Sequence, residues 1–183
     1  MPNNLLIVGA GEYSVVAYEI AKSMGCFDEI GFVDDYATQT SLNIPVLGTV
    51  DSIENLSEIY GKIILAIGNP MVKSALWNKI KNIKNIEIAT LISPNAFVSP
   101  SATVGAGTIV EPFGLVGALC KIGKGCIISS GGVVNHHAEC GDFVHIDCNA
   151  TVESSAKVPS ETKLCSGEVF SKNEPAFSLS KKL

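Results

Sequence analysis

The sequence has 183 residues, of which 17% are charged and only 7% aromatic, and its formal net charge is −5. This length suits one domain or two small ones. The acidic balance argues against a protein that binds the nucleic-acid backbone, and no apolar run approaches the ~18 residues that span a bilayer. The start, Met1-Pro2-Asn3-Asn4, lacks the basic segment of a secretory signal. We therefore expect a soluble, cytoplasmic protein with neither a nucleic-acid nor a membrane partner.

The first 90 residues alternate apolar runs with helical patterns, as parallel α/β sheets do. We expect strands at 5–8, 30–33, 62–67 and 86–91. We expect helices from the glycine turn at 9–11 to Gly25, over 51–59 and over 72–83. Residues 1–90 are thus predicted to form a small Rossmann-like domain.

From Ile92 to Phe170 the sequence follows a period of six residues. Every sixth position carries Val, Ile, Leu or Phe, with Cys140 as the one exception, and a small residue stands four positions after most of these anchors. This period is typical of the hexapeptide β-helix, in which three short strands close a coil of about 18 residues. Residue i then lies about 4.8 Å from its equivalent in the next coil. We predict such a β-helix over residues 91–183.

The six cysteines include no C-x-x-C pair, so their spacing favours neither a zinc site nor a disulfide framework. Cys120 and Cys126 fall in the column of small residues and Cys140 falls on an anchor. We expect the cysteines to be small buried thiols in a reducing compartment.

All three histidines, His136, His137 and His145, fall within one stretch of ten residues. The period places His136 and His145 at turns, outside the interior column. One turn histidine is usually just solvated, but three on adjacent faces of one coil indicate a site. A neutral imidazole can deprotonate an amine or hydroxyl that attacks an acyl carbon. Ser154 is expected one coil above His136, where its backbone N–H would stabilise an oxyanion.

A metal site is the rival interpretation of the three histidines. Trimeric β-helices of the γ-class carbonic anhydrase type gather imidazoles at a subunit interface. Their histidine spacing is wider than the H-H-x7-H found here, and no α/β domain normally precedes them. We therefore expect no metal. The acid that would orient a catalytic histidine stays open between Glu139 and the expected column of Glu111, Ser129 and Asp147.

The predicted Rossmann-like domain carries polar groups at the ends of its strands. The segment 9–14, G-A-G-E-Y-S, follows the first strand, and backbone N–H groups at such a turn can hold a phosphate. Asp34 and Asp35 end the second strand, where they suit a ribose or a base. Loop acids are also often just solvated. Gly68-Asn69 ends the third strand at the same edge, which predicts one crevice.

With these motifs, the sequence resembles the bacterial nucleotide-sugar acyltransferases of the sialic acid O-acetyltransferase and PglD-like UDP-4-amino-sugar N-acetyltransferase type. The matching stretches are L-L-I-V-G-A-G-E-Y-S, G-F-V-D-D, L-A-I-G-N-P-M-V-K and V-V-N-H-H-A-E-C-G-D-F-V-H-I. The resemblance implies a left-handed β-helix, a homotrimer, and acetyl transfer from acetyl-CoA. The acceptor it implies is an amino group, or else a hydroxyl, on a nucleotide-linked sugar such as a UDP-amino sugar.

The resemblance also implies roles for single residues. His136 matches the general base, His145 matches a histidine on the acetyl-CoA side, and Ser154 stands where a glycine N–H serves the oxyanion. The residues implied to contact the nucleotide sugar are Gly9, Gly11, Tyr13, Asp34, Asp35 and Lys73.

Differences from the family keep a second function open. Asn135 and His137 replace the acids that usually flank the base. The β-helix is expected to be one coil shorter than usual, and the tail 176–183 lacks the usual G-x-P-A segment. These parts normally line the CoA groove. The alternative is a nucleotide-sugar-binding trimer with weak or no catalysis.

Overall fold

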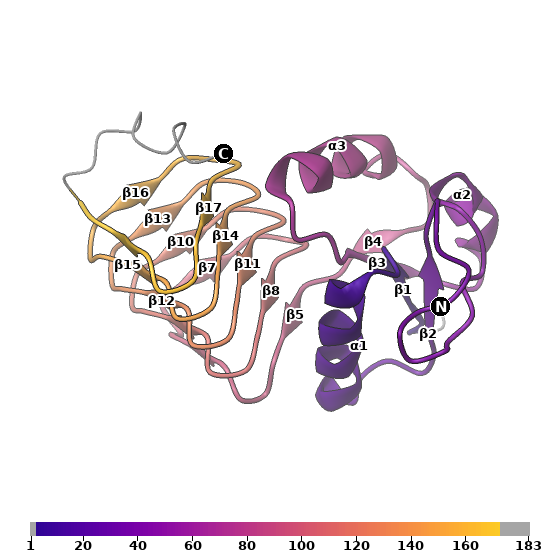
Figure 1. Ribbon diagram of the computed structural model, residues 1–183, viewed down its shortest axis with the longest axis horizontal. Coiled ribbons are helices and arrows are strands. Elements are labelled where there is room, and N and C mark those ends of the chain that lie inside the picture. The colour runs from indigo at the N-terminus through magenta and orange to yellow at the C-terminus, as the bar shows by residue number, and fades with distance from the viewer. Residues whose placement is uncertain (1–2, 173–183) are drawn as a thin grey trace.

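The N-terminal domain in the computed structural model, which describes residues 3–172, is built on a parallel sheet of order β2-β1-β3-β4 (Figure 1). Alternate residues of the sheet point to opposite faces, and each face is covered by helix. One face packs against α1, and the other packs against α2 and α3. The elements are β1 Leu5–Val8, α1 Glu12–Met24, β2 Ile30–Val33, a 3-10 turn Val50–Ser52, α2 Ile53–Leu56, β3 Lys62–Leu65, α3 Pro70–Ile80 and β4 Glu87–Ile88.

Several boundaries differ from the sequence prediction for local reasons. Helix α1 ends as expected at Gly25, which has a left-handed φ of 64°. Helix α3 begins two residues early, because the Asn69 side chain accepts hydrogen bonds from the N–H groups of Met71 and Val72. The helix expected over 51–59 shortens to the 3-10 turn and α2. The strand expected over 86–91 divides between β4 and the first strand of the β-helix.

The β-helix stacks very short strands into three parallel sheets. Partners are 18 residues apart, as in Ile127 with His145, which confirms the predicted coil. The strands are β5 Leu91–Ile92, β6 Phe97–Val98, β7 Thr103–Val104, β8 Ile109–Val110, β9 Leu115–Val116, β10 Lys121–Ile122, β11 Ile127–Ile128, β12 Val133–Val134, β13 Glu139–Cys140, β14 His145–Ile146, β15 Thr151–Val152, β16 Lys157–Val158, β17 Lys163–Leu164 and β18 Val169–Phe170.

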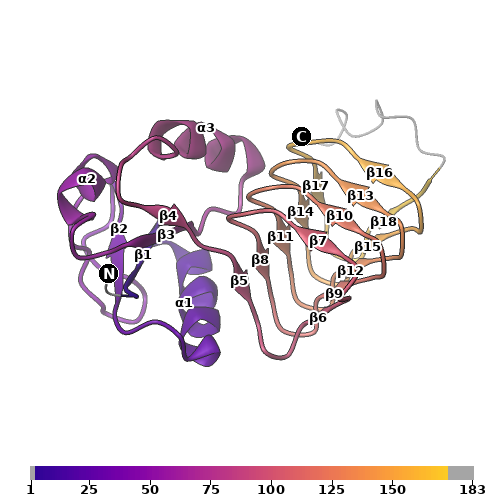
Figure 2. The ribbon, with the colours of Figure 1, turned by 180° about the vertical axis from the view of Figure 1, so that it is seen from behind.

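The three sheets give the prism three different faces. The domain face, made of β5, β8, β11, β14 and β17, lies toward the N-terminal domain, and its Leu91 and Ile109 pack with α1. The apolar face consists of β6, β9, β12, β15 and β18, whose stack is visible in Figure 2. The charged face consists of β7, β10, β13 and β16. The second residue of each strand points into the prism.

The cysteines of the β-helix core behave as predicted. Cys120, Cys126 and Cys140 are buried in the prism among the Val and Ile anchors. Cys148 is half-buried, and all six cysteines are unpaired. The prediction of buried thiols is wrong for Cys26 and Cys165, which are exposed.

Within residues 3–172, no helix combines the length and apolar character needed to cross a bilayer.

Candidate functional site

A crevice of about 210 Å³ opens at the carboxyl ends of β1 and β2. Gly9, Asp34 and Asp35 line it, so the structure brings these three sequence-derived candidates together. Gly9 has a φ of +106°, and a Cβ there would stand 2.9 Å from Cδ1 of Ile67, so the turn requires glycine. A Cβ on Gly11 would meet no atom within 4 Å. The space in front of the first turn of α1 is therefore open.

The two acids at the end of β2 have different surroundings. Asp34 accepts hydrogen bonds of 2.8 Å from the N–H groups of Ala10, Tyr36 and Ala37. Burial opposes ionisation, but these donors outweigh it and lower the pKa of Asp34. Asp34 thus holds the two loops of the crevice together. Asp35 is exposed, and its Oδ1 accepts a hydrogen bond of 2.8 Å from the N–H of Val50; among residues 3–172 its other oxygen has no partner.

Tyr36 is a further residue of the crevice that sequence reasoning missed. Its side chain is 97% exposed, although it lines the crevice beside Asp35. A large, exposed aromatic ring beside a polar crevice suits stacking on a flat ligand group. The signal available in the sequence was its position directly after the V-D-D strand end.

His145 lies between the two domains and not at a turn, so that prediction is wrong. It is the outward residue of β14 and is 6% exposed. Its Nδ1 lies 2.8 Å from the carbonyl oxygen of Gly68, and its Nε2 lies 3.1 Å from Oγ of Ser129. Burial lowers the pKa of His145, so the neutral ring donates from Nδ1 and accepts from the Ser129 hydroxyl. Both ring nitrogens of His145 therefore make hydrogen bonds within the protein.

Tyr13 and Glu111 complete this interdomain cluster. The Tyr13 ring lies 6.4 Å from the His145 ring, and its hydroxyl is buried without a hydrogen-bond partner among the described residues. Burial and the nearby Glu111 raise the pKa of Tyr13 well above 10.0. Glu111 accepts from the N–H and hydroxyl of Ser130 at 3.0 and 3.1 Å. With Asp147, which interacts with His145, these acids surround His145 and not His136.

Lys73 is not in the crevice, contrary to the role implied by the sequence. It lies on α3 and is only 1% exposed, and its Nζ has no hydrogen-bond partner in the described part of the chain. Burial lowers its pKa to about 7. Val72 and Leu76 of α3 line the crevice, and Lys73 does not.

His136 and His137 stand exposed at the corner between β12 and β13. Their Nδ1 atoms are 2.9 Å apart and their rings meet edge-on at 86°. Ser155 in the next coil donates its N–H to the carbonyl of His136 at 3.1 Å. The N–H of Ser154 donates to no backbone oxygen within residues 3–172.

The expectation that all three histidines cluster on adjacent faces is wrong. A corner of a triangular coil lies opposite its third side, so the β12–β13 corner is opposite the domain face that carries His145. Residues 3–172 contain no group of three His, Cys, Asp or Glu side chains arranged to hold a metal ion.

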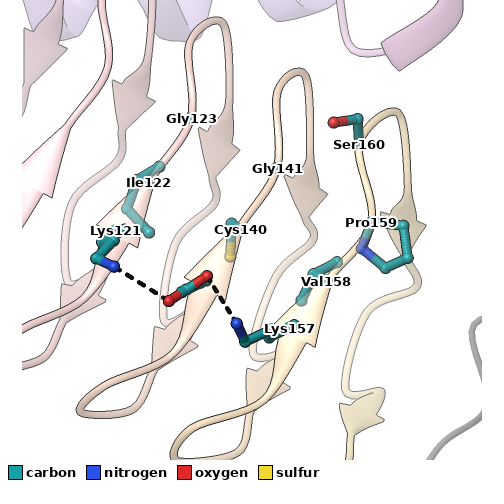
Figure 3. Close-up of a pocket in the computed structure, with 10 residues that line it drawn as sticks. Lys121, Ile122, Gly123, Cys140, Gly141, Lys157, Val158, Pro159 and Ser160 are labelled. Atoms are coloured by element: carbon teal, nitrogen blue, oxygen red, sulfur yellow. Dashed lines mark hydrogen bonds and ion pairs between the residues drawn. The ribbon is translucent and has the colours of Figure 1, made fainter.

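A shallow pocket of about 400 Å³ lies on the charged face (Figure 3). Glu139 there pairs with Nζ of Lys121 at 3.2 Å and with Nζ of Lys157 at 3.3 Å. Hydrogen bonds from the two lysines lower the pKa of Glu139. Glu139 thus pairs with lysines of the charged face, and within residues 3–172 it makes no hydrogen bond to His136.

The comparisons with known proteins agree with this architecture. A sequence profile described as the PglD N-terminal domain matches residues 4–80. The first domain is therefore similar to PglD N-terminal domains. No curated protein sequence matches the chain significantly.

Solved structures extend the likeness to more than nine-tenths of the chain. The acetyltransferase domain of PglB from Neisseria gonorrhoeae is 25% identical, with 92% of this chain and 91% of that chain covered and a TM-score of 0.70. The same domain in complex with acetyl coenzyme A is 23% identical, with coverage of 93% and 94% and a TM-score of 0.72.

A third similar structure contains two bound molecules. It is a histidine-to-asparagine variant of perosamine N-acetyltransferase from Caulobacter crescentus in complex with CoA and GDP-perosamine. It is 23% identical, covers 91% of this chain and 88% of its own, and has a TM-score of 0.79. The resemblance to PglD-like nucleotide-sugar acetyltransferases is thus confirmed, as is the Rossmann-like domain followed by a left-handed β-helix.

Proposed function

We propose that this protein transfers an acetyl group from acetyl-CoA to an amino group of a nucleotide-linked sugar, with His136 as the general base. The observation that carries the proposal is the exposed imidazole of His136 one coil below the N–H of Ser154, which has no backbone acceptor within residues 3–172. The similar structures hold acetyl coenzyme A in one case, and CoA with GDP-perosamine in another. Six unpaired cysteines support a reducing, cytoplasmic location.

In the proposed reaction, the sugar amine attacks the thioester carbonyl while a nitrogen of His136 accepts the amine proton. The developing oxyanion accepts a hydrogen bond from the N–H of Ser154. The carbon–sulfur bond then breaks, and the CoA thiolate takes up the proton. The same arrangement can acylate a hydroxyl group, but an amine is the better nucleophile near neutral pH.

The crevice of the N-terminal domain is proposed to hold the nucleotide. The open space before Gly11 suits the phosphates, since the first turn of a helix presents unbonded N–H groups. The second oxygen of Asp35 is available to the ribose or the base, and Tyr36 supplies a flat ring beside it.

We expect Tyr36→Ala to raise the KM for the nucleotide sugar and to leave kcat nearly unchanged. Loss of a base–aromatic stack costs about 1–3 kcal/mol, which corresponds to roughly 5–150-fold. Steady-state kinetics with varied nucleotide sugar would show the change, and Tyr36→Phe is the matched control because it keeps the ring. An unchanged KM in Tyr36→Ala would contradict stacking at this position.

The active unit is proposed to be a homotrimer. His136 stands opposite the domain face, so the crevice of one chain and the histidine of the same chain do not face each other. A neighbouring chain would bring them together. The apolar face supports this, because outward side chains such as Phe97 and Val169 are 58% and 53% exposed. Exposed apolar rows of this kind mark interfaces, and closed cyclic assemblies are the usual outcome.

We expect Leu115→Asp, on strand β9 of the apolar face, to dissociate the trimer into monomers and to abolish acetyl transfer. A carboxylate buried in an apolar interface is strongly unfavourable. Sedimentation velocity measures the oligomeric state directly. Thr103→Asp is the matched control on the charged face and should leave the trimer intact. A Leu115→Asp protein that stays trimeric would place the interface elsewhere.

A thiol-release assay with acetyl-CoA and a panel of UDP- and GDP-amino sugars tests the function itself. Release of CoA only in the presence of an amino sugar supports the transferase. The alternative, a nucleotide-sugar-binding trimer, is favoured by the absence of an acid beside His136. It would show nucleotide-sugar binding by calorimetry with no thiol released.

A further inference from the structure

We propose that His137 is a positioning residue for His136. In this proposal His137 accepts a hydrogen bond from Nδ1–H of His136, which leaves Nε2 of His136 as the basic atom. The proposal rests on the function proposed above and names a further residue of the same site. It starts from the 2.9 Å separation of the two Nδ1 atoms.

The contact requires that the two rings hold different tautomers. A neutral imidazole carries a proton on one nitrogen and a lone pair on the other. At 2.9 Å one Nδ1 must donate and the other must accept. If His136 donates, its Nε2 holds the lone pair and faces away from His137. When that Nε2 takes up the amine proton, the Nδ1–H becomes a charged donor and the hydrogen bond strengthens. The contact therefore stabilises the transition state more than the ground state.

Neighbouring coils hold the backbone of this pair on both sides. His137 has a left-handed φ of 62°, and its N–H donates to the carbonyl of Ala118 in the preceding coil at 2.8 Å. The carbonyl of His136 accepts from Ser155 in the following coil at 3.1 Å. These bonds fix the two backbone positions from which the rings meet edge-on.

The carboxylates near this corner are engaged with other groups. Glu139 pairs with its two lysines on the charged face. Glu153, one coil above Asn135, accepts from the N–H of Lys172 at 3.0 Å. The acids around His145 lie on the opposite side of the prism. Among the described residues, His137 is thus the side chain bonded to the ring of His136.

Nitrogen NMR on labelled protein at mildly alkaline pH tests the tautomers without any substrate. Long-range proton–nitrogen correlations distinguish a protonated from an unprotonated ring nitrogen, and His137→Asn assigns the signals. We expect His136 in the Nδ1–H form and His137 in the Nε2–H form. Two rings that are both in the Nε2–H form would overturn the proposal, even if the protein proves to be an acetyltransferase.

Kinetics test whether the contact matters for transfer. We expect His137→Ala to lower kcat about 10–100-fold with KM nearly unchanged, as with other residues that orient a functional imidazole. His137→Asp restores an acceptor and tolerates the left-handed backbone, so it should recover most of kcat. Glu161→Ala is the matched control, because Glu161 has a φ of 60° at another exposed corner.

Full activity in His137→Ala, or no recovery in His137→Asp, would overturn the positioning role. An inactive wild-type protein with the expected tautomers would contradict the proposed function and leave the contact itself confirmed.

Discussion

Replacing His136 with asparagine is expected to lower kcat for acetyl transfer by about 10²–10⁴-fold, the usual contribution of a general base. Asparagine cannot accept the amine proton, but it is similar in size and polarity. The KM values of both substrates should change little, because the proposed nucleotide contacts lie on the N-terminal domain and the N–H of Ser154 is a backbone group. Steady-state kinetics with each substrate varied would separate the two effects.

Folding controls are straightforward at this position. His136 is exposed, and the backbone hydrogen bond at this residue uses its carbonyl oxygen. The variant should keep the wild-type melting temperature and oligomeric state. A variant that retains wild-type kcat would remove His136 from the mechanism and would favour the binding function instead.

Replacing Lys73 with methionine is expected to stabilise the protein at neutral pH by on the order of 4 kcal/mol. The pKa of Lys73 falls from 10.5 to about 7 because of burial, and a tenfold change in a proton-binding constant corresponds to about 1.36 kcal/mol. Methionine has a similar length and carries no amine, so no group has to be deprotonated or dehydrated at this position when the protein folds. Urea unfolding at fixed protein concentration measures the difference.

The same substitution should also change how stability depends on pH. The folded pKa of Lys73 is lowered, so between about pH 7 and 10.5 the unfolded chain binds a proton that the folded chain does not, and stability rises with pH. Below about pH 7 both states are protonated and this slope ends. Above 9.0 the raised pKa values of buried thiols such as Cys126 and Cys140 work in the opposite direction. The effect of Lys73 on stability is therefore best measured between about pH 7 and 8.5, where the thiols do not oppose it.

Over that range, wild-type protein should gain about 2 kcal/mol with rising pH, and Lys73→Met should lack this gain. Lys79→Met is the matched control, because Lys79 lies on the same helix but is exposed and paired with Asp51. Equal pH slopes in wild type and Lys73→Met would show that the Lys73 amine is solvated or paired in solution.

The β-helix could be predicted nearly to the residue. Its six-residue period gives the position of each strand, and three periods give the strand with which it pairs. Each anchor from Ile92 to Phe170 is the second residue of a strand. The same six-residue period was sufficient to place His145 correctly. A residue five places after one anchor directly precedes the next anchor, so it must be the outward residue of a strand and not part of a turn.

Sequence reasoning failed where a side chain's role depends on how the two domains pack. Nothing local to Lys73 indicates that its amine is buried near Cys126 of the β-helix. His145 likewise owes its burial to the carbonyl of Gly68, which is 77 residues away in the chain. Asp34 accepts hydrogen bonds from three backbone N–H groups of the loops. The directions of these N–H groups depend on the folded loops and cannot be read from the sequence.

The stacking of coils has a consequence for how such a protein can diversify. Each coil advances the chain by about 4.8 Å and returns it to the same face. Gain or loss of one whole coil, about 18 residues, would therefore leave every face with its own set of side chains. The height of His136 above the N-terminal domain can change only in these steps. In the proposed function, the number of coils would therefore set the distance between the nucleotide end and the acylated end of a substrate, in steps of one coil.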